Sequence, residues 1–201
     1  MYQVSANFLI SLFLSSQFNI YCSKNVTLIP RTNSMRQFLL VISTMASGKI
    51  HISGTLLLTP LTAGLAWHLT GGDVPTTVLA SAGCLSGVLI SPDLDMANRT
   101  ISETVVIRWL GVLGYLWMVL WKPYACLHKH RGISHVPLLG TLTRVAYLAV
   151  CYLLLHCVAR EFYQLDLLTW PQQYWQHGLV LFAGLTISDV GHWALDGFAW
   201  R

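Results

Sequence analysis

The chain has 201 residues, of which 54% are apolar and only 10% are charged, whereas charged residues make up about 25% of a typical soluble domain. Of the net charge of +4, most comes from Lys24, Arg31 and Arg36 within residues 1–44, which contain no acid, so the remainder of the chain is close to neutral. This composition predicts an integral membrane protein, and the lack of a concentrated basic face argues against nucleic-acid binding.

Residues 1–44 differ in character from the rest of the chain. They contain an apolar run followed by a basic stretch rich in Ser, Thr and Asn. The run lacks the basic start and the small-residue cleavage site of a signal peptide. We therefore predict that residues 1–44 are an N-terminal extension, either an extra apolar segment or a non-native start, and that residues 45–201 form the membrane-embedded functional domain.

Five apolar segments follow, at 51–70, 76–92, 105–124, 136–158 and 176–195. Their lengths are near the roughly 20 residues that an α-helix needs to span a bilayer. The predicted fold class is therefore all-α, a small helical membrane bundle of four to five apolar helices. The third segment is the least certain to cross, because Arg108, Gly111 and Gly114 interrupt it. It either crosses, enters and returns, or lies along the membrane interface.

Titratable residues gather at the ends of these segments. They are His51 at the start of the first, Asp93 and Asp95 after the second, His130 and His135 before the fourth, and Asp189, His192 and Asp196 in the fifth. On an α-helix the last three lie within about 60° of one another around the axis. Acids in so apolar a segment are costly unless they are paired or ligated. Each group also has an interpretation without a bound ligand. Asp93 and Asp95 could be an ordinary helix-capping pair, Asp189, His192 and Asp196 a hydrogen-bonded trio, and His51 an isolated residue at the membrane interface.

Topology decides whether these residues can meet. If the segment 105–124 crosses the membrane, the candidates divide between its two faces. If it does not, four crossings place all eight on one face together with most of the basic residues, and the positive-inside rule makes that face cytoplasmic. We therefore predict a metal site at the cytoplasmic boundary of the membrane, formed by His51, Asp93, Asp95, His130, His135, Asp189, His192 and Asp196.

Imidazole and carboxylate ligands without thiolate suit Zn²⁺ in the first place, or Mn²⁺ or Fe, and eight ligands suffice for one or two ions. Such a site can activate water, which predicts a metal-dependent hydrolase of esters or phosphoesters, including those of membrane lipids or other amphiphiles. Arg131 would contact an anionic group of the substrate. The alternatives are a non-catalytic metal-binding membrane protein with a structural, sensing or transport role, and a soluble helical domain with unusually apolar helices.

These motifs, taken in order, carry a family resemblance. His51, Pro-Asp-Leu-Asp at 92–95, His-Arg-Gly-Ile-Ser-His at 130–135 and the spacing of Asp189, His192 and Asp196 resemble the bacterial YdjM-type family of membrane-bound metal-dependent hydrolases. They are more similar still to a related family described only as metal-binding proteins. The resemblance covers about residues 45–201 and implies a bacterial cytoplasmic-membrane protein that binds metal. It implies hydrolysis less firmly, and Val136 stands where the hydrolase pattern often has serine.

Overall fold

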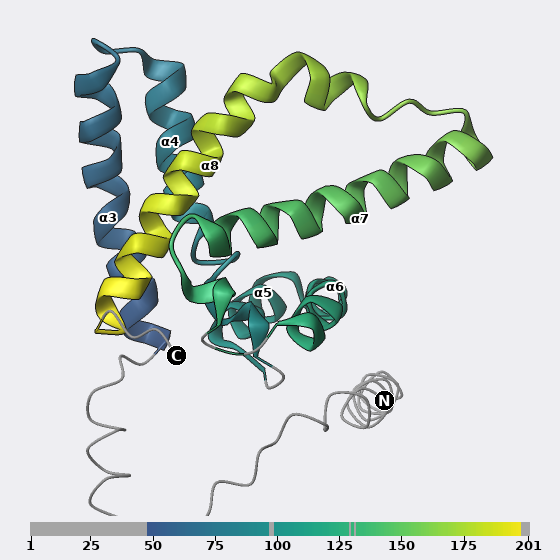
Figure 1. Cartoon of the computed structure of the whole chain (residues 1–201), viewed down its shortest axis with the longest axis horizontal. Helices are drawn as coiled ribbons and strands as arrows, with labels where there is room; N and C mark the ends of the chain where they lie inside the picture. Colours follow the sequence, from purple (N-terminus) through teal and green to yellow (C-terminus); the bar gives the residue numbers. More distant parts are fainter. Residues whose placement is uncertain (1–47, 97–98, 129, 131, 198–201) are drawn as a thin grey trace, which may run out of the picture.

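The computed structural model describes residues 48–96, 99–128, 130 and 132–197, and the regular elements within them are all helical (Figure 1). The helices are α3 (Gly48–Leu69), α4 (Val74–Ser86), α5 (Ile101–Leu110), α6 (Leu113–Leu127), α7 (Leu139–Tyr163) and α8 (Thr169–Leu195), with the short 3₁₀ helices η2 (Pro92–Asp95) and η3 (Ile133–His135). The predicted all-α fold class is confirmed. The predicted extension at 1–44 lies outside the described residues.

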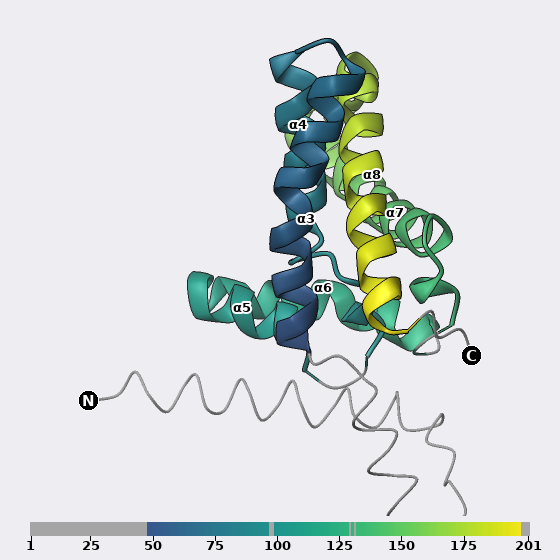
Figure 2. The same ribbon diagram turned by 90° about the vertical axis from the view of Figure 1, so that its left-hand side faces the viewer.

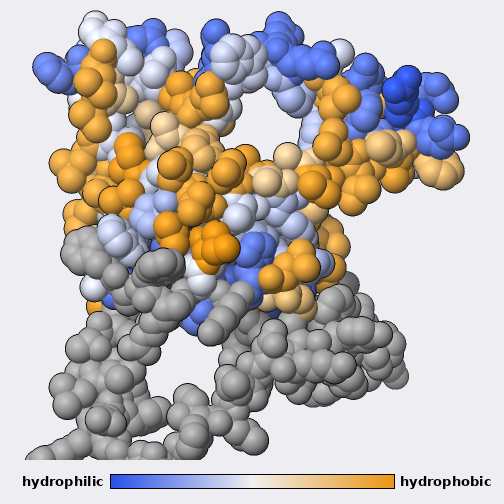
Figure 3. Space-filling view, in the orientation of Figure 1, coloured by the Kyte–Doolittle hydropathy of each residue, from blue (hydrophilic) through white to orange (hydrophobic). Residues whose placement is uncertain are grey.

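Three helices, α3, α7 and α8, are long and apolar enough to cross a membrane. They correspond to the predicted segments 51–70, 136–158 and 176–195. Apolar side chains cover much of their outer surface, as Figure 3 shows for one face. Leu57 on α3 and Leu154 on α7, for example, are 71% and 63% exposed. The predicted segment 76–92 forms the shorter α4, whose 13 residues extend for about 20 Å at 1.5 Å per residue.

Helices α3, α4 and α8 run side by side (Figure 2), and small residues bring α4 and α8 close together. A Cβ atom added to Gly83 would lie 2.2 Å from the carbonyl oxygen of Leu181, and one added to Gly184 would lie 2.1 Å from the carbonyl oxygen of Ala80. Close backbone approach through small residues is the way in which helices commonly pack in lipid. The position of α8, which carries part of the site, therefore depends on these two glycines.

The segment 105–124 does not form one straight helix. Helix α5 ends at Leu110 and is followed by Gly111, whose φ of +57° is in the left-handed region that favours glycine; α6 begins at Leu113. Neither α5 nor α6 is among the helices long and apolar enough to cross a membrane. Figure 2 shows both running across the bundle near one end. The segment is therefore two helices joined at a glycine, and whether it crosses, enters and returns, or lies along the interface stays a prediction.

The contact between α4 and α8 gives a prediction for stability. Gly184→Ala should destabilise the fold by about 1–3 kcal/mol, because the added methyl group would overlap the carbonyl of Ala80. The matched control is Gly178→Ala on the same helix, where an added Cβ would meet nothing within 4 Å. That control should be neutral or slightly stabilising. Thermal unfolding of the detergent-purified variants measures both effects, and equal stabilities would contradict the packing described for Gly184.

Candidate metal centre

Seven of the eight predicted ligands come together at one end of the bundle, where the ends of several elements meet. The contributors are His51 from the first turn of α3, Asp93 and Asp95 from η2, His130 and His135 from the chain entering η3 and from η3 itself, and His192 and Asp196 from the end of α8. The turn into η2 is held by Ser91, whose hydroxyl accepts a hydrogen bond from the backbone N–H of Asp93 at 3.1 Å. Sequence-distant side chains thereby reach one place.

One group of potential ligands consists of His51, His192 and Asp196, whose ligand atoms lie within 4.8 Å of one another. The rings of His51 and His192 are stacked, with centroids 3.7 Å apart. Nε2 of His51 lies 3.2 Å from Oδ1 of Asp196, and Nε2 of His192 lies 3.6 Å from Oδ2 of Asp196. The four-residue spacing on α8 places His192 and Asp196 on the same helical face, as the sequence predicted.

The second group consists of Asp93, His130 and His135, again with ligand atoms within 4.8 Å of one another. Nε2 of His135 lies 3.4 Å from Oδ1 of Asp93. His135 is buried, whereas the His130 side chain is 40% exposed. The second group is therefore open to the surface at His130, whereas both histidines of the first group are buried.

Asp93 connects the two groups. Its Oδ1 lies 3.4 Å from Nε2 of His135 and 3.6 Å from Nε2 of His192. Both ring nitrogens are buried and have no hydrogen-bond partner. A buried polar atom without a partner is costly, and two of them facing one carboxylate oxygen fit a bound cation. The chemistry of this donor set, imidazole nitrogen and carboxylate oxygen, suits a divalent transition metal.

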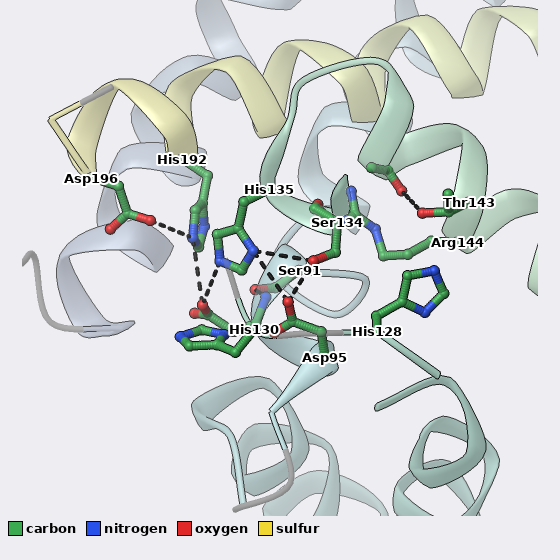
Figure 4. A network of polar contacts seen from close by, with 12 residues as sticks. Ser91, Asp95, His128, His130, Ser134, His135, Thr143, Arg144, His192 and Asp196 are labelled. Atoms are coloured by element: carbon green, nitrogen blue, oxygen red, sulfur yellow. Dashed lines mark hydrogen bonds and ion pairs between the residues drawn. The ribbon is translucent and has the colours of Figure 1, made fainter. Parts of the chain in front are cut away.

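Asp95 lies on the other side of the imidazole rings (Figure 4). Its Oδ1 is 2.7 Å from Nδ1 of His130, and its Oδ2 is 2.5 Å from Oγ of Ser134 and 3.3 Å from Nδ1 of His135. A carboxylate that accepts from Nδ1 fixes the orientation of the ring and leaves Nε2 for a metal. The structure therefore places Asp95, a predicted ligand, where it orients two other ligands.

The electrostatics of the cluster favour a cation. Burial disfavours the ionised form of Asp93, but the imidazoles of His135 and His192, whose Nε2 atoms lie at ion-pair distance from its Oδ1, outweigh this effect and hold the pKa of Asp93 well below its usual range. For Asp95, burial is outweighed by hydrogen bonds from His130 and His135, so its pKa is about 2. Burial also opposes the charged form of His135, but the two carboxylates raise its pKa to about 9. The carboxylates are thus ionised and available to a metal.

A small pocket adjoins the first group. His51, Asp93 and His192 line it, together with the hydroxyl-bearing residues Thr55, Ser91 and Ser102. Ser102 comes from α5, so the helix that lies across the end of the bundle closes one side of this pocket. Because the pocket borders ligands of both groups, a water molecule in it would lie beside the metal centre.

Asp189 does not join either group. Its Oδ2 accepts hydrogen bonds from the hydroxyl of Thr141 and from Nη2 of Arg144, both on α7. The structure therefore brings seven of the eight predicted ligands to the end of the bundle and turns the eighth toward α7. Arg131, the predicted contact to an anionic substrate group, lies outside the described residues.

Two functional neighbours were missed by sequence reasoning, Ser134 and Arg144. Ser134 donates to Asp95, and Arg144 pairs with Asp189. The sequence does contain an indication for Arg144. It is the one Lys or Arg residue in the apolar segment 136–158, and Asp189 is the one acidic residue in the apolar segment 176–195. Isolated charges of opposite sign in two membrane segments are expected to pair. Ser134 carried no comparable signal.

Comparison with known proteins places the chain in a family. A family model described as uncharacterized metal-binding protein (DUF2227) matches residues 46–200, a range that includes all the ligands described above. The chain belongs to this family. The DUF2227 match confirms the predicted resemblance to metal-binding proteins and gives no support to the YdjM-type hydrolase resemblance.

An uncharacterized protein of Aquifex aeolicus (strain VF5) is 41% identical to this DUF2227 member over 64 residues. The aligned part covers 32% of this chain and 39% of that protein. No solved structure matches the chain at a significant level. The family assignment thus comes from the sequence match, and the arrangement of the ligands comes from the structure described above.

The different positions of Asp93 and Asp95 give a prediction for metal binding. Asp93→Asn should abolish or halve the metal content, because it removes the carboxylate oxygen that lies between His135 and His192. Asp95→Asn should retain metal with an affinity about 10–100-fold lower, because it weakens only the hydrogen bonds behind the rings. Elemental analysis and chelator competition on detergent-purified protein measure the two effects.

The control for this experiment is His128→Gln. The His128 ring stacks on Tyr124 with centroids 4.1 Å apart, and it belongs to neither ligand group. Metal content and affinity should be those of the wild type. Equal losses in the Asp93 and Asp95 variants would contradict the separate roles assigned to the two carboxylates.

Proposed function

We propose that this protein is an integral membrane hydrolase that uses one or two divalent metal ions to cleave an ester or phosphoester. The observation that carries the proposal is the position of Asp93, whose Oδ1 faces two buried ring nitrogens without hydrogen-bond partners beside a small pocket. A purely structural metal site is normally closed by its ligands, whereas a catalytic site keeps a position for water or substrate. A pocket that borders the ligands supports the second type.

The ligands would be divided between two positions. His51, His192 and Asp196 would hold one ion, His130 and His135 would hold the other, and Asp93 would be shared. Zn²⁺ suits this donor set first, and Mn²⁺ or Fe are the alternatives. When bound, such an ion lowers the pKa of a coordinated water to roughly 7 and so supplies a nucleophile at neutral pH.

The protein's own residues would orient the reactants. Asp95 fixes the rings of His130 and His135 through their Nδ1 atoms. The hydroxyl of Ser102, which lines the pocket, would donate a hydrogen bond to a polar group of the substrate. Arg131 remains our proposed contact for an anionic oxygen, because a guanidinium matches the geometry of phosphate and carboxylate.

The location of the site at the end of membrane-spanning helices favours an amphiphilic substrate. We propose four crossings, α3, α4, α7 and α8, with α5 and α6 in the interface beside the site. Basic residues Lys49, Arg99, Arg108 and Lys122 belong to segments at the site's end of the bundle, which by the positive-inside rule faces the cytoplasm of a bacterial cell. Membrane lipid is then the surrounding solvent and a source of ester substrates.

A non-catalytic metal-binding role is the second candidate function. It is favoured by the burial of His51, His192 and His135, each no more than 8% exposed. Ligands enclosed to this degree are also found at structural and sensing sites. The two functions differ in whether metal-loaded protein turns over a substrate.

Metal removal tests the enzymatic proposal. Detergent-purified protein should contain one or two divalent ions per chain and should hydrolyse members of a panel of phosphodiester, phosphomonoester and lipid ester substrates. Chelation should abolish turnover, and re-addition of Zn²⁺ or Mn²⁺ should restore it. Asp196→Ala should lose both metal and activity, while His128→Gln should keep both. Full metal content with no turnover across the panel would favour the non-catalytic role.

Reporter fusions test the proposed orientation. Gly72 belongs to the connection between α3 and α4, and Asp166 belongs to the connection between α7 and α8; Figure 1 shows both connections away from the end of the bundle where α8 finishes. Periplasmic reporters such as alkaline phosphatase should be active at both positions, and a fusion within the loop after Met96 should be inactive. Opposite results for Gly72 and Asp166 would refute four crossings with α5 and α6 in the interface.

A further inference from the structure

Arg144 on α7 and Asp189 on α8 form an ion pair within the apolar part of the fold. Arg144 is 0% exposed and Asp189 is 3% exposed. Nε of Arg144 and Oδ1 of Asp189 nevertheless lack hydrogen-bond partners. A buried ion pair is often no more stabilising than apolar side chains of the same size, and this one is only partly satisfied. Stability by itself therefore does not account for the pair.

The second arm of the guanidinium reaches toward the metal centre. While Nη2 of Arg144 donates to Asp189, Nη1 donates to the carbonyl oxygen of Ser134 at 3.2 Å. Ser134 in turn donates through Oγ to Asp95 and directly precedes His135 in η3. One planar side chain thus contacts both α8 and the turn that carries a metal ligand. The fixed fork of an arginine is suited to hold two acceptors at a set separation.

The metal centre needs such a connection because its two halves come from different parts of the fold. His192 and Asp196 belong to α8, whereas His135 belongs to η3, which packs on the start of α7. Figure 1 shows α7 diverging from α8 along most of its length. The distances from Asp93 to His135 and to His192 depend on how η3 is held relative to α8.

Gly140 in the first turn of α7 provides a second constraint on the same carbonyl. A Cβ atom added there would lie 2.0 Å from the carbonyl oxygen of Ser134. The carbonyl is therefore enclosed between α7 and the guanidinium of Arg144.

We propose that Arg144 is a positioning residue that sets the separation of the two ligand groups by joining Ser134 to Asp189. This inference rests on the metal centre of the proposed function and is independent of hydrolysis. Its readout is metal affinity and coordination geometry, so it can be tested without a substrate.

The decisive variants separate an effect on the stability of the fold from an effect on metal affinity. In Arg144→Met with Asp189→Leu, apolar side chains replace both charges, so the thermal stability of the full chain in detergent should stay near that of the wild type. Zn²⁺ affinity by chelator competition should nevertheless fall about 10–100-fold, the usual effect of losing a residue that orients ligands. The absorption spectrum of the Co²⁺-loaded protein should also change.

Arg144→Lys covers the case in which the double variant does not fold. A lysine keeps the charge beside Asp189 but replaces the two-armed guanidinium with a single ammonium group, so Zn²⁺ affinity should again fall about 10–100-fold. Thr141→Val is the matched control, because it removes another hydrogen bond to Asp189 without touching Ser134. Arg160→Met, an exposed arginine on the same helix, controls for charge. Both controls should bind Zn²⁺ as the wild type does.

Wild-type Zn²⁺ affinity and an unchanged Co²⁺ spectrum in Arg144→Lys would overturn this proposal alone. The same holds if Thr141→Val loses as much affinity as Arg144→Lys, because the effect would then belong to the packing of α7 on α8. A wild-type chain that binds no Zn²⁺ would overturn the positioning role and the metal centre together.

Discussion

Imidazole nitrogens and carboxylates buried at the end of an apolar bundle must have partners, and this requirement connects most of the features of the structure. In a medium of low polarity, each unpaired imidazole or carboxylate costs several kcal/mol of folding free energy. Summed over a cluster of such groups, this cost is of the order of the net stability of a whole domain. Asp93, between His135 and His192, is the point where this cost is concentrated. Neither ring nitrogen is satisfied by the protein. A divalent cation would satisfy both while balancing the carboxylates.

The bundle around the site is built to place these groups. Close packing of α4 on α8 sets where α4 ends and therefore where η2 begins. Near the site the hydroxyls of Thr55 on α3 and Ser188 on α8 hydrogen-bond at 3.1 Å, so the third helix is tied to the same frame. His51, in the first turn of α3, stacks on His192 and lies 3.2 Å from Oδ1 of Asp196 in the same region. The same tight packing that lets helices associate in lipid thus supplies the rigidity that a metal centre needs.

The sequence predicted the helical class, the three long apolar helices and most of the ligands, because each depends on local composition or spacing. It did not predict which carboxylates would face the metal centre, which would orient other ligands and which would pair with an arginine. In a 3₁₀ helix of about three residues per turn, residues two apart point in different directions, and here Asp93 faces Nε2 of His135 while Asp95 faces Nδ1 of the same ring. On α8 the angular argument for Asp189 was sound, but seven residues correspond to about 10 Å along the axis. That distance takes Asp189 away from Asp196 and opposite Arg144.

The pairing of Arg144 with Asp189 also explains why two costly residues occur inside segments that otherwise suit lipid. An apolar pair would hold α7 to α8 equally well, but it would offer no donor to the Ser134 carbonyl. The arginine joins three elements, and the third is the turn that carries His135. The polar residues inside the apolar helices and those at the end of the bundle therefore form one connected network, from Asp189 through Arg144, Ser134 and Asp95 to the imidazoles of His130 and His135.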